Sequence, residues 1–280
     1  MEIRVVGILG MALKPRYVVM VFFSGSKGGT GKSTLAANLA ILLSQSLKTN
    51  TLLIDLGVDS SQTASRILGV VPDKSGALDY LVGSVSEVNQ LVDKSSYLSS
   101  VFVVPPGMTR SYQLNIGIKD AYSRWLDMLN SLVMATGASV ILIDMPANAP
   151  MPITVPPLLT AQIINIVLDH AAYSEYVLRE IDNAYVQPML TQLGYKQVIN
   201  VILNKSLPNM DVDNRIRGYA RNGEVFVLPT SPIVQYLTAT LKPVVLYEPR
   251  GTLAEFRKAF DNMTNTLTRQ VKAMLTGHVD

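Results

Sequence analysis

A short segment near the amino end of the chain combines glycines with two lysines and several hydroxyl side chains. Its three glycines allow successive backbone N–H groups to turn toward one polyphosphate, and the helix expected to follow adds the positive end of its dipole. Lys32 is expected to reach the β- and γ-phosphates, and the Ser33 hydroxyl to bind Mg²⁺. The sequence therefore predicts a phosphate-binding loop made of Gly28, Gly29, Thr30, Gly31, Lys32, Ser33 and Thr34.

The residues on either side of this loop agree with that interpretation. Residues 17–23 are mostly β-branched or aromatic, as in a buried strand, and residues 33–43 have apolar side chains at helical spacing. A strand, a glycine-rich loop and a helix thus follow in the order that phosphate binding requires. A chance glycine turn between a strand and a helix is the disfavoured alternative.

A carboxylate at the end of a later strand is the second candidate for phosphate chemistry. Asp144 directly follows the apolar residues 140–143, and ligands of parallel sheets bind beyond the carboxyl ends of the strands. There it is well placed to hold the water shell of Mg²⁺, so Ser33 and Asp144 form the expected metal site. A helix-capping role is weaker, because five prolines between residues 146 and 157 favour an extended, semi-rigid switch segment.

Strands and helices alternate along the chain, which predicts an α/β fold with a mostly parallel twisted sheet and helices on both faces. We expect a single domain over residues 1–280, with residues 1–15 as an added strand or hairpin rather than a signal peptide. Pro188 should kink or divide its helix. The other expected strands are 51–55, 100–104, 139–144, 162–168, 198–203 and 225–228, and the helices are 119–135, 172–193 and 253–275.

Composition excludes several classes of protein. The 280 residues are 48% hydrophobic, which is enough for a sizeable core. Cysteine is absent, which removes disulfides, thiolate metal sites and iron–sulfur ligation. The mean hydropathy is +0.26, yet no apolar run approaches the roughly eighteen residues of a spanning helix. We therefore expect a cytoplasmic protein without stable membrane insertion.

The run from Lys27 to Thr34 resembles the deviant Walker A box of the ParA/MinD family of partition and cell-division ATPases. In that family the early lysine crosses a dimer interface to the partner's nucleotide. The resemblance implies a P-loop NTPase fold, ATP and Mg²⁺ as cofactors, and an ATP-dependent homodimer in which Lys27 completes the partner's site. Only sixteen residues precede the first expected strand, so the chain is most similar to ParA/Soj-type partition ATPases without an N-terminal helix-turn-helix.

The segment after the second strand departs from the family pattern. The family usually has Asp-x-Asp there, and Asp55 matches the first aspartate, whereas Gly57 stands at the second position. Asp59 either substitutes for the missing carboxylate near the attacking water or caps a helix that starts near residue 60. The resemblance therefore implies an ATPase, and Gly57 implies slow hydrolysis.

Two later segments extend the resemblance. Asp144 and the residues after it are similar to the Walker B and switch II segment of the family. Asn204 follows a strand as the family's base-recognition asparagine does, and Pro229 lies in the segment expected to line the other side of adenine. An ordinary turn residue is the alternative for Asn204.

ParA-like relatives bind DNA without sequence preference in the ATP state, through basic residues late in the chain. Residues 205–272 of this chain contain ten basic and six acidic side chains. The resemblance implies non-specific double-stranded DNA and a ParB-like activator protein as partners, and a nucleoid-associated location. An ordinary charged surface is the alternative. The DNA-binding candidates are Arg215, Arg217, Arg221, Lys242 and Arg250.

Three other functions stay open. A MinD-like membrane-associated role would need an amphipathic C-terminal helix, but the apolar stripe of residues 253–274 is better explained as a core face. An ATP-dependent amidase or ligase of the same fold would need a small-molecule pocket, and such enzymes usually lack Lys27. A nucleotide-stabilised scaffold that scarcely hydrolyses ATP is the third, suggested by Gly57.

Overall fold

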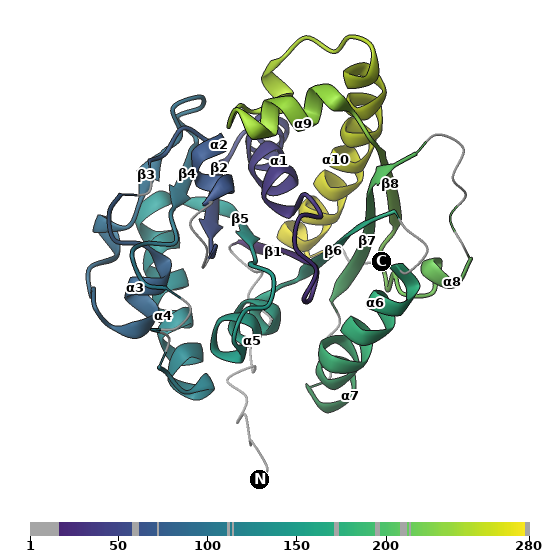
Figure 1. Ribbon diagram of the computed structural model, residues 1–280. Coiled ribbons are helices and arrows are strands. Elements are labelled where there is room, and N and C mark those ends of the chain that lie inside the picture. Colours follow the sequence, from purple (N-terminus) through teal and green to yellow (C-terminus); the bar gives the residue numbers. More distant parts are fainter. Residues whose placement is uncertain are drawn as a thin grey trace.

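A computed structural model shows one eight-stranded sheet (Figure 1). It describes residues 17–57, 62–71, 73–110, 113, 115–170, 174–193, 197–207, 212 and 214–277. The strand or hairpin expected at residues 1–15 lies outside the described residues, as does Asp59.

The sheet has the strand order β3-β4-β2-β5-β1-β6-β7-β8. All neighbouring strands are parallel except β3 and β4. Parallel neighbours require crossover connections, and the helices supply them, so the expected fold class is confirmed. The strands are β1 Val18–Phe23, β2 Asn50–Asp55, β3 Asp93–Lys94, β4 Val101–Val104, β5 Ala138–Asp144, β6 Ile163–Asp169, β7 Val198–Ser206 and β8 Val225–Pro229.

Strand β1 shows why both faces of the sheet are covered. All six of its residues are buried, and successive side chains of a strand point to opposite faces. Val18, Met20 and Phe22 pack with one group of helices, and the residues between them pack with another. The first group is α1 Lys32–Leu47, α2 Thr63–Ile67, α9 Pro232–Ala239 and α10 Thr252–Thr276. The second is α3 Ala77–Val82, α4 Ile118–Thr136, α5 Met151–Thr160, α6 Ser174–Ile181, α7 Gln187–Leu193 and α8 Asn214–Arg217.

The proline-rich segment after β5 is not the extended switch that the sequence predicts. Its later part forms α5, so the prediction is wrong for residues 151–160, whereas Pro146 and Pro150 precede the helix. Pro152 lies in the first turn of α5. The N–H groups of a first turn have no partner within the helix, so a proline there costs no helical hydrogen bond. Pro156 lies inside the helix, and its carbonyl accepts a hydrogen bond from Thr160 Oγ1, whose oxygen in turn accepts one from the Trp125 indole at 3.0 Å. Packing against α4 outweighs the local preference of proline.

The helix expected at residues 172–193 is divided, as predicted from the presence of Pro188. Helix α6 ends at Ile181, a π-helical turn spans Asp182–Val186, and α7 follows from Gln187. A proline has no N–H to donate, and its ring collides with the carbonyl four residues earlier in a regular α-helix. The wider π turn directly before Pro188 relieves that collision.

Candidate nucleotide-binding site

The loop between β1 and α1 has the backbone shape that its glycines predict. Gly29 has a φ of 72° and Gly31 a φ of 96°, both in the left-handed region that side chains disfavour. No side chain of the described residues caps α1, which begins at Lys32. The first N–H groups of this sixteen-residue helix therefore point toward the loop, where an anion is stabilised.

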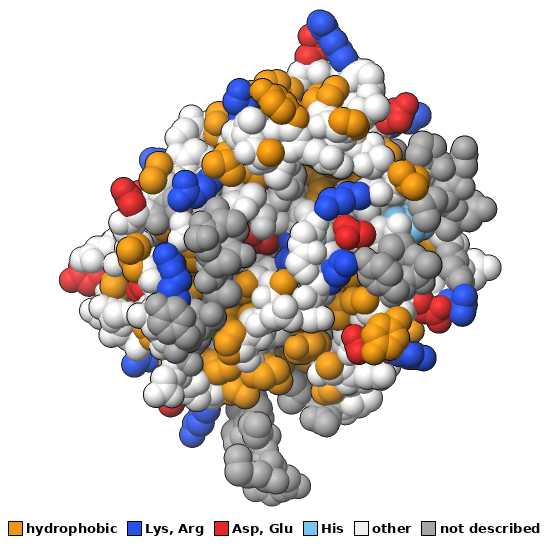
Figure 2. Space-filling model, in the orientation of Figure 1, with side chains coloured by type: hydrophobic (Ala, Val, Ile, Leu, Met, Phe, Trp, Pro, Cys, Tyr) orange, Lys and Arg blue, Asp and Glu red, His pale blue; other side chains and the backbone are white. Residues whose placement is uncertain are grey.

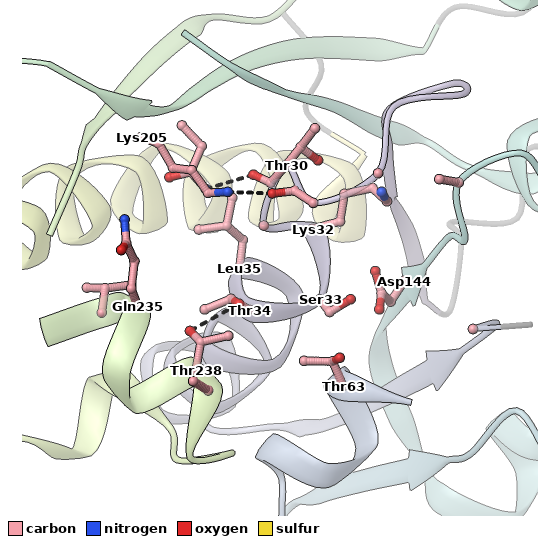
Figure 3. A pocket seen from close by; sticks show the side chains of 18 of the residues that line it. Thr30, Lys32, Ser33, Thr34, Leu35, Thr63, Asp144, Lys205, Gln235 and Thr238 are labelled. Carbon is pink, nitrogen blue, oxygen red and sulfur yellow. Dashed lines mark hydrogen bonds between the residues drawn. The ribbon is translucent and has the colours of Figure 1, made fainter. Parts of the chain in front are cut away.

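A cavity of about 450 Å³ opens over this loop at the carboxyl ends of the central strands (Figure 3). Its lining comes from the loop, the end of β2, the segment after β5, the end of β7, and the end of β8 with α9. The lining residues outside the start of α1 include Gly28, Gly29, Thr30, Gly31, Asp55, Gly57, Thr63, Asp144, Asn204, Lys205, Pro229, Val234, Gln235 and Thr238. Most of the predicted site residues thus come together.

The two loop lysines differ in their surroundings. Lys32 is 7% exposed, and its ammonium donates a hydrogen bond to Ser24 Oγ at 2.7 Å. Lys27 is half-buried, and it does not line the cavity in the part of the chain that the structure describes. The Lys27 carbonyl accepts a hydrogen bond from Ser24 Oγ at 2.5 Å, so Ser24 connects the two lysines.

The predicted metal ligands lie near each other. Figure 3 shows the Ser33 hydroxyl and the Asp144 carboxylate on the same side of the cavity. Asp144 is 4% exposed and ends β5, which pairs with both β1 and β2. Among the described residues, no group of three or more His, Cys, Asp or Glu side chains could hold a metal ion. One hydroxyl and one carboxylate suit Mg²⁺, which keeps several waters and phosphate oxygens as its other ligands.

Asp55 holds the chain together beside the cavity. It is 1% exposed, and its Oδ2 accepts hydrogen bonds from the Ser65 N–H at 3.0 Å and from Ser65 Oγ at 2.9 Å. Its Oδ1 accepts a hydrogen bond from the Gly57 N–H at 2.9 Å. Asp55 therefore fixes α2 to the end of β2. A role for Asp55 at the attacking water stays a prediction.

The end of β7 is distant from the phosphate-binding loop in sequence but contacts it in the fold. The Asn204 amide donates from Nδ2 to the Thr30 carbonyl at 2.8 Å. The Lys205 ammonium donates to the Gly29 carbonyl at 2.5 Å and lies 3.7 Å from Asp169 Oδ1. Lys205 was not predicted as a site residue; its place beside Asn204, after the expected strand 198–203, was the only signal for it.

Helix α9 is the other part of the site that the sequence did not reveal. Its residues Val234, Gln235 and Thr238 line the cavity, and Thr238 Oγ1 lies 3.3 Å from Thr34 Oγ1. This pair of hydroxyls joins α9 to α1. Pro229 lines the cavity at the end of β8, as expected.

The five predicted DNA-binding residues do not form one patch. Three belong to α8 and the residues after it, whereas Lys242 and Arg250 lie between α9 and α10, at the top of Figure 1 and away from α8. Arg215 pairs with Glu175 at 3.0 Å, Arg221 with Asp182 at 2.8 Å, and Arg250 with Glu248 at 2.6 Å. In the view of Figure 2, basic side chains are interspersed with acidic ones.

Residues 21–244 match the protein family described as the CobQ/CobB/MinD/ParA nucleotide binding domain. This match covers most of the chain, so the chain belongs to that family. The resemblance to ParA/MinD proteins inferred from the phosphate-binding loop is confirmed.

Solved structures of this fold include two MinD proteins and a partition protein. MinD from Pyrococcus horikoshii OT3, complexed with Mg-ADP, has 19% identity and a TM-score of 0.69, over 92% of this chain and 98% of that one. MinD from Aquifex aeolicus has 22% identity and a TM-score of 0.67, over 90% of this chain and 97% of that one. A protein described as a plasmid partition protein from Borrelia burgdorferi B31, bound to AMPPNP, has 16% identity and a TM-score of 0.70, over 91% and 99%. At these identities the shared property is the fold.

One curated protein matches part of the chain. A dihydroxy-acid dehydratase from a Nitratiruptor species is 26% identical over 140 residues, which are 49% of this chain. The chain covers 25% of the length of that dehydratase, so this match assigns no activity.

Proposed function

We propose that this chain is an ATP-dependent, dimerising ATPase that partitions DNA. Its family places it among ATPases of the ParA/MinD type. The observation that carries the finer proposal is Lys27, because this second lysine of the loop is absent from the described lining of the chain's own cavity. That position supports a role at the nucleotide of a second copy.

The cofactors are ATP and Mg²⁺. The cavity has the size of a small-molecule site, and its floor combines loop N–H groups with the buried Lys32. The oxygen donors Ser33 and Asp144 fit Mg²⁺. Mg²⁺ bound there would neutralise charge on the β- and γ-phosphates.

Each site residue has a separate task in this proposal. Lys32 binds phosphate in its own subunit, and Lys27 completes the site of the partner copy. Ser33 and Asp144 hold the metal. Asp55 fixes the position of Gly57, where the family pattern has a second aspartate. Gly57 lines the cavity at the position where relatives carry a second aspartate, and we expect slow hydrolysis for that reason.

The closed dimer would bind DNA through basic side chains, and a ParB-like protein would stimulate hydrolysis and release. The sequence isoelectric point of about 9.0 supports contact with phosphate. Nucleoid association would follow from this binding. The two groups of basic residues, around α8 and between α9 and α10, are separate candidates for the DNA surface.

A membrane-associated role has less support. The stripe on α10 that suggested an amphipathic anchor is buried, with Phe256 at 3% exposure and Phe260 and Leu267 at 0%. It belongs to the core on one face of the sheet. Within the described residues, no helix has the length and apolar character needed to cross a membrane.

The test is binding to random-sequence duplex DNA with ATP, ADP or no nucleotide, over a series of salt concentrations. We expect binding only with ATP, with affinity falling steeply as salt rises because counterions are released. The Lys27→Ala variant should lose binding, while Lys48→Ala, an exposed lysine at the far end of α1, should keep it. No binding in any nucleotide state would contradict the DNA proposal, and lipid vesicles would then be tested.

A further inference from the structure

Two neighbouring side chains at the end of β7 hold two consecutive carbonyls of the phosphate-binding loop. Asn204 Nδ2 donates to the Thr30 carbonyl at 2.8 Å, and Lys205 Nζ donates to the Gly29 carbonyl at 2.5 Å. Figure 3 shows Lys205 beside Thr30 of the loop. These bonds join residues about 175 positions apart in the sequence. We refer to Asn204 and Lys205 as the β7 pair.

The direction of these bonds affects the loop N–H groups. In a trans peptide unit, the carbonyl and the following N–H point in opposite directions. Turning the Gly29 and Thr30 carbonyls toward β7 therefore turns the N–H groups of Thr30 and Gly31 away from it. Orienting these donors before the ligand arrives removes part of the entropic cost of binding.

The backbone at the end of β7 is held in place by its neighbours, as a role in orienting the loop requires. Its residue Asn204 pairs with Asp169 of β6, the Asn204 carbonyl accepts a hydrogen bond from the His170 N–H at 2.9 Å, and Thr230 donates to the Ser206 carbonyl at 2.8 Å. Lys205 has a φ of 56°, which is uncommon for a lysine and turns the chain at this point. The backbone of the β7 pair is thus fixed by β6 at Asn204 and by the residue after β8 at Ser206.

The fit between the β7 pair and the loop is close. Asn204 is 7% exposed, and a Cβ added at Gly31 would overlap its Nδ2 atom. The Lys205 ammonium lies between the Gly29 carbonyl and Asp169 Oδ1, which is 3.7 Å away. The Thr30 carbonyl accepts from one of the two N–H groups of Asn204 Nδ2.

We propose that Asn204 and Lys205 are positioning residues that orient the phosphate-binding loop, with Asp169 holding the Lys205 ammonium in place. Asn204 then acts on the phosphate end of the ligand through the loop, a role that the sequence did not suggest. This inference rests on the proposed binding of ATP by this chain.

The first test compares ATP with inorganic tripolyphosphate, which has no base, in the presence of Mg²⁺. Dissociation constants are measured by calorimetry for the wild type, Asn204→Ala and Lys205→Met. Loss of the buried Asn204 hydrogen bond should weaken both ligands by about the same factor, roughly tenfold. Loss of the exposed Lys205 hydrogen bond should also weaken both ligands equally, by about threefold. Lys205→Arg keeps a donor and should recover most of the affinity, and Lys48→Met is the matched control.

The outcomes separate the possible roles. If Asn204→Ala weakens ATP but leaves tripolyphosphate unchanged, Asn204 reads the base and the positioning role is wrong. If Lys205→Met changes neither ligand, Lys205 has no part in the site. If the wild type binds neither ligand, the proposed ATP binding itself fails. Equal unfolding temperatures of the ligand-free variants exclude a general loss of stability.

A second test separates orientation from simple charge attraction. Asp169→Asn removes a negative charge near the loop, so charge attraction alone predicts tighter binding of tripolyphosphate. Positioning predicts weaker binding, by about threefold, because the Lys205 ammonium loses the carboxylate that holds it. Tighter binding by this variant would overturn the positioning role of Asp169 and Lys205.

Discussion

The two sides of the nucleotide cavity are held in different ways. On the phosphate side, a complete glycine-lysine loop starts α1, and side chains from β7 fix its carbonyls. On the side formed by the end of β2, the carboxylate of Asp55 accepts hydrogen bonds from Ser65 and Gly57 and so holds the chain. The first side is arranged to bind an anion, whereas the second has Gly57 at the position where the resemblance predicts an aspartate. Nucleotide binding and hydrolysis should therefore be separable by mutation.

The largest expected effect is on the phosphate side. Lys32→Ala should weaken ATP binding by about 1,000-fold, because a buried ammonium at the phosphates is removed. Titration with a fluorescent ATP analogue measures this loss. Lys48→Ala should bind as the wild type does, and a loss of less than about tenfold for Lys32→Ala would mean that the loop is not the phosphate site.

Lys27→Ala should separate binding from assembly. We expect ATP affinity within a few-fold of the wild type, because Lys27 does not contribute to the described cavity lining. The ATP-induced dimer should be lost, and hydrolysis should fall by about 100-fold, the usual loss for one preorganised donor. Sedimentation with ATP and phosphate release measure the two effects. A variant that still dimerises and hydrolyses ATP would show that the crossing lysine is absent.

Gly57→Asp directly tests the side of the cavity that contains Asp55 and Gly57. Restoring a carboxylate at this position of the cavity should raise the hydrolysis rate by about tenfold, part of the gain that a positioned acid-base group can give. ATP affinity should change little. Gly57→Asn has nearly the same shape without the charge and should leave the rate low. An equal gain from both variants would indicate a structural effect.

The smallest effects are expected at the two groups of basic residues. Arg217→Ala and Arg250→Ala each remove one cation, from α8 and from the segment before α10. If one of the two groups contacts DNA, the variant in that group should reduce the slope of log affinity against log salt by about one. Binding measured over the salt series identifies that group, since the other variant should keep the wild-type slope. Unchanged slopes in both variants would exclude both groups.

The sequence alone predicted the parts of the fold that depend on local patterns. The seven expected strands, α1, α4 and α10, and the division at Pro188 all follow from apolar spacing or from the chemistry of one residue. Helix α5 was missed because its prolines disfavour a helix, whereas its packing against α4, which includes the hydrogen bond between Trp125 and Thr160, favours one. Short elements such as β3, with two residues, are too brief to leave a pattern.

The site could be predicted to a similar extent. The loop, Ser33 and Asp144 were found because their motifs are contiguous in the chain. The contacts of Asn204 and Lys205 with the loop depend on which strands lie near β1, and this order is set by the whole sheet. The DNA candidates were grouped by sequence position, although the fold separates α8 from the segment after α9.

The central place of β1 also has a consequence for local unfolding. β1 lies between β5 and β6, and its amides belong to the most deeply buried strand of the sheet. Amide hydrogens there should exchange only on global unfolding, whereas the short, partly exposed α9 should open at much lower free energy. The wall of the cavity that α9 provides should therefore open before the floor that binds the phosphates loses its structure.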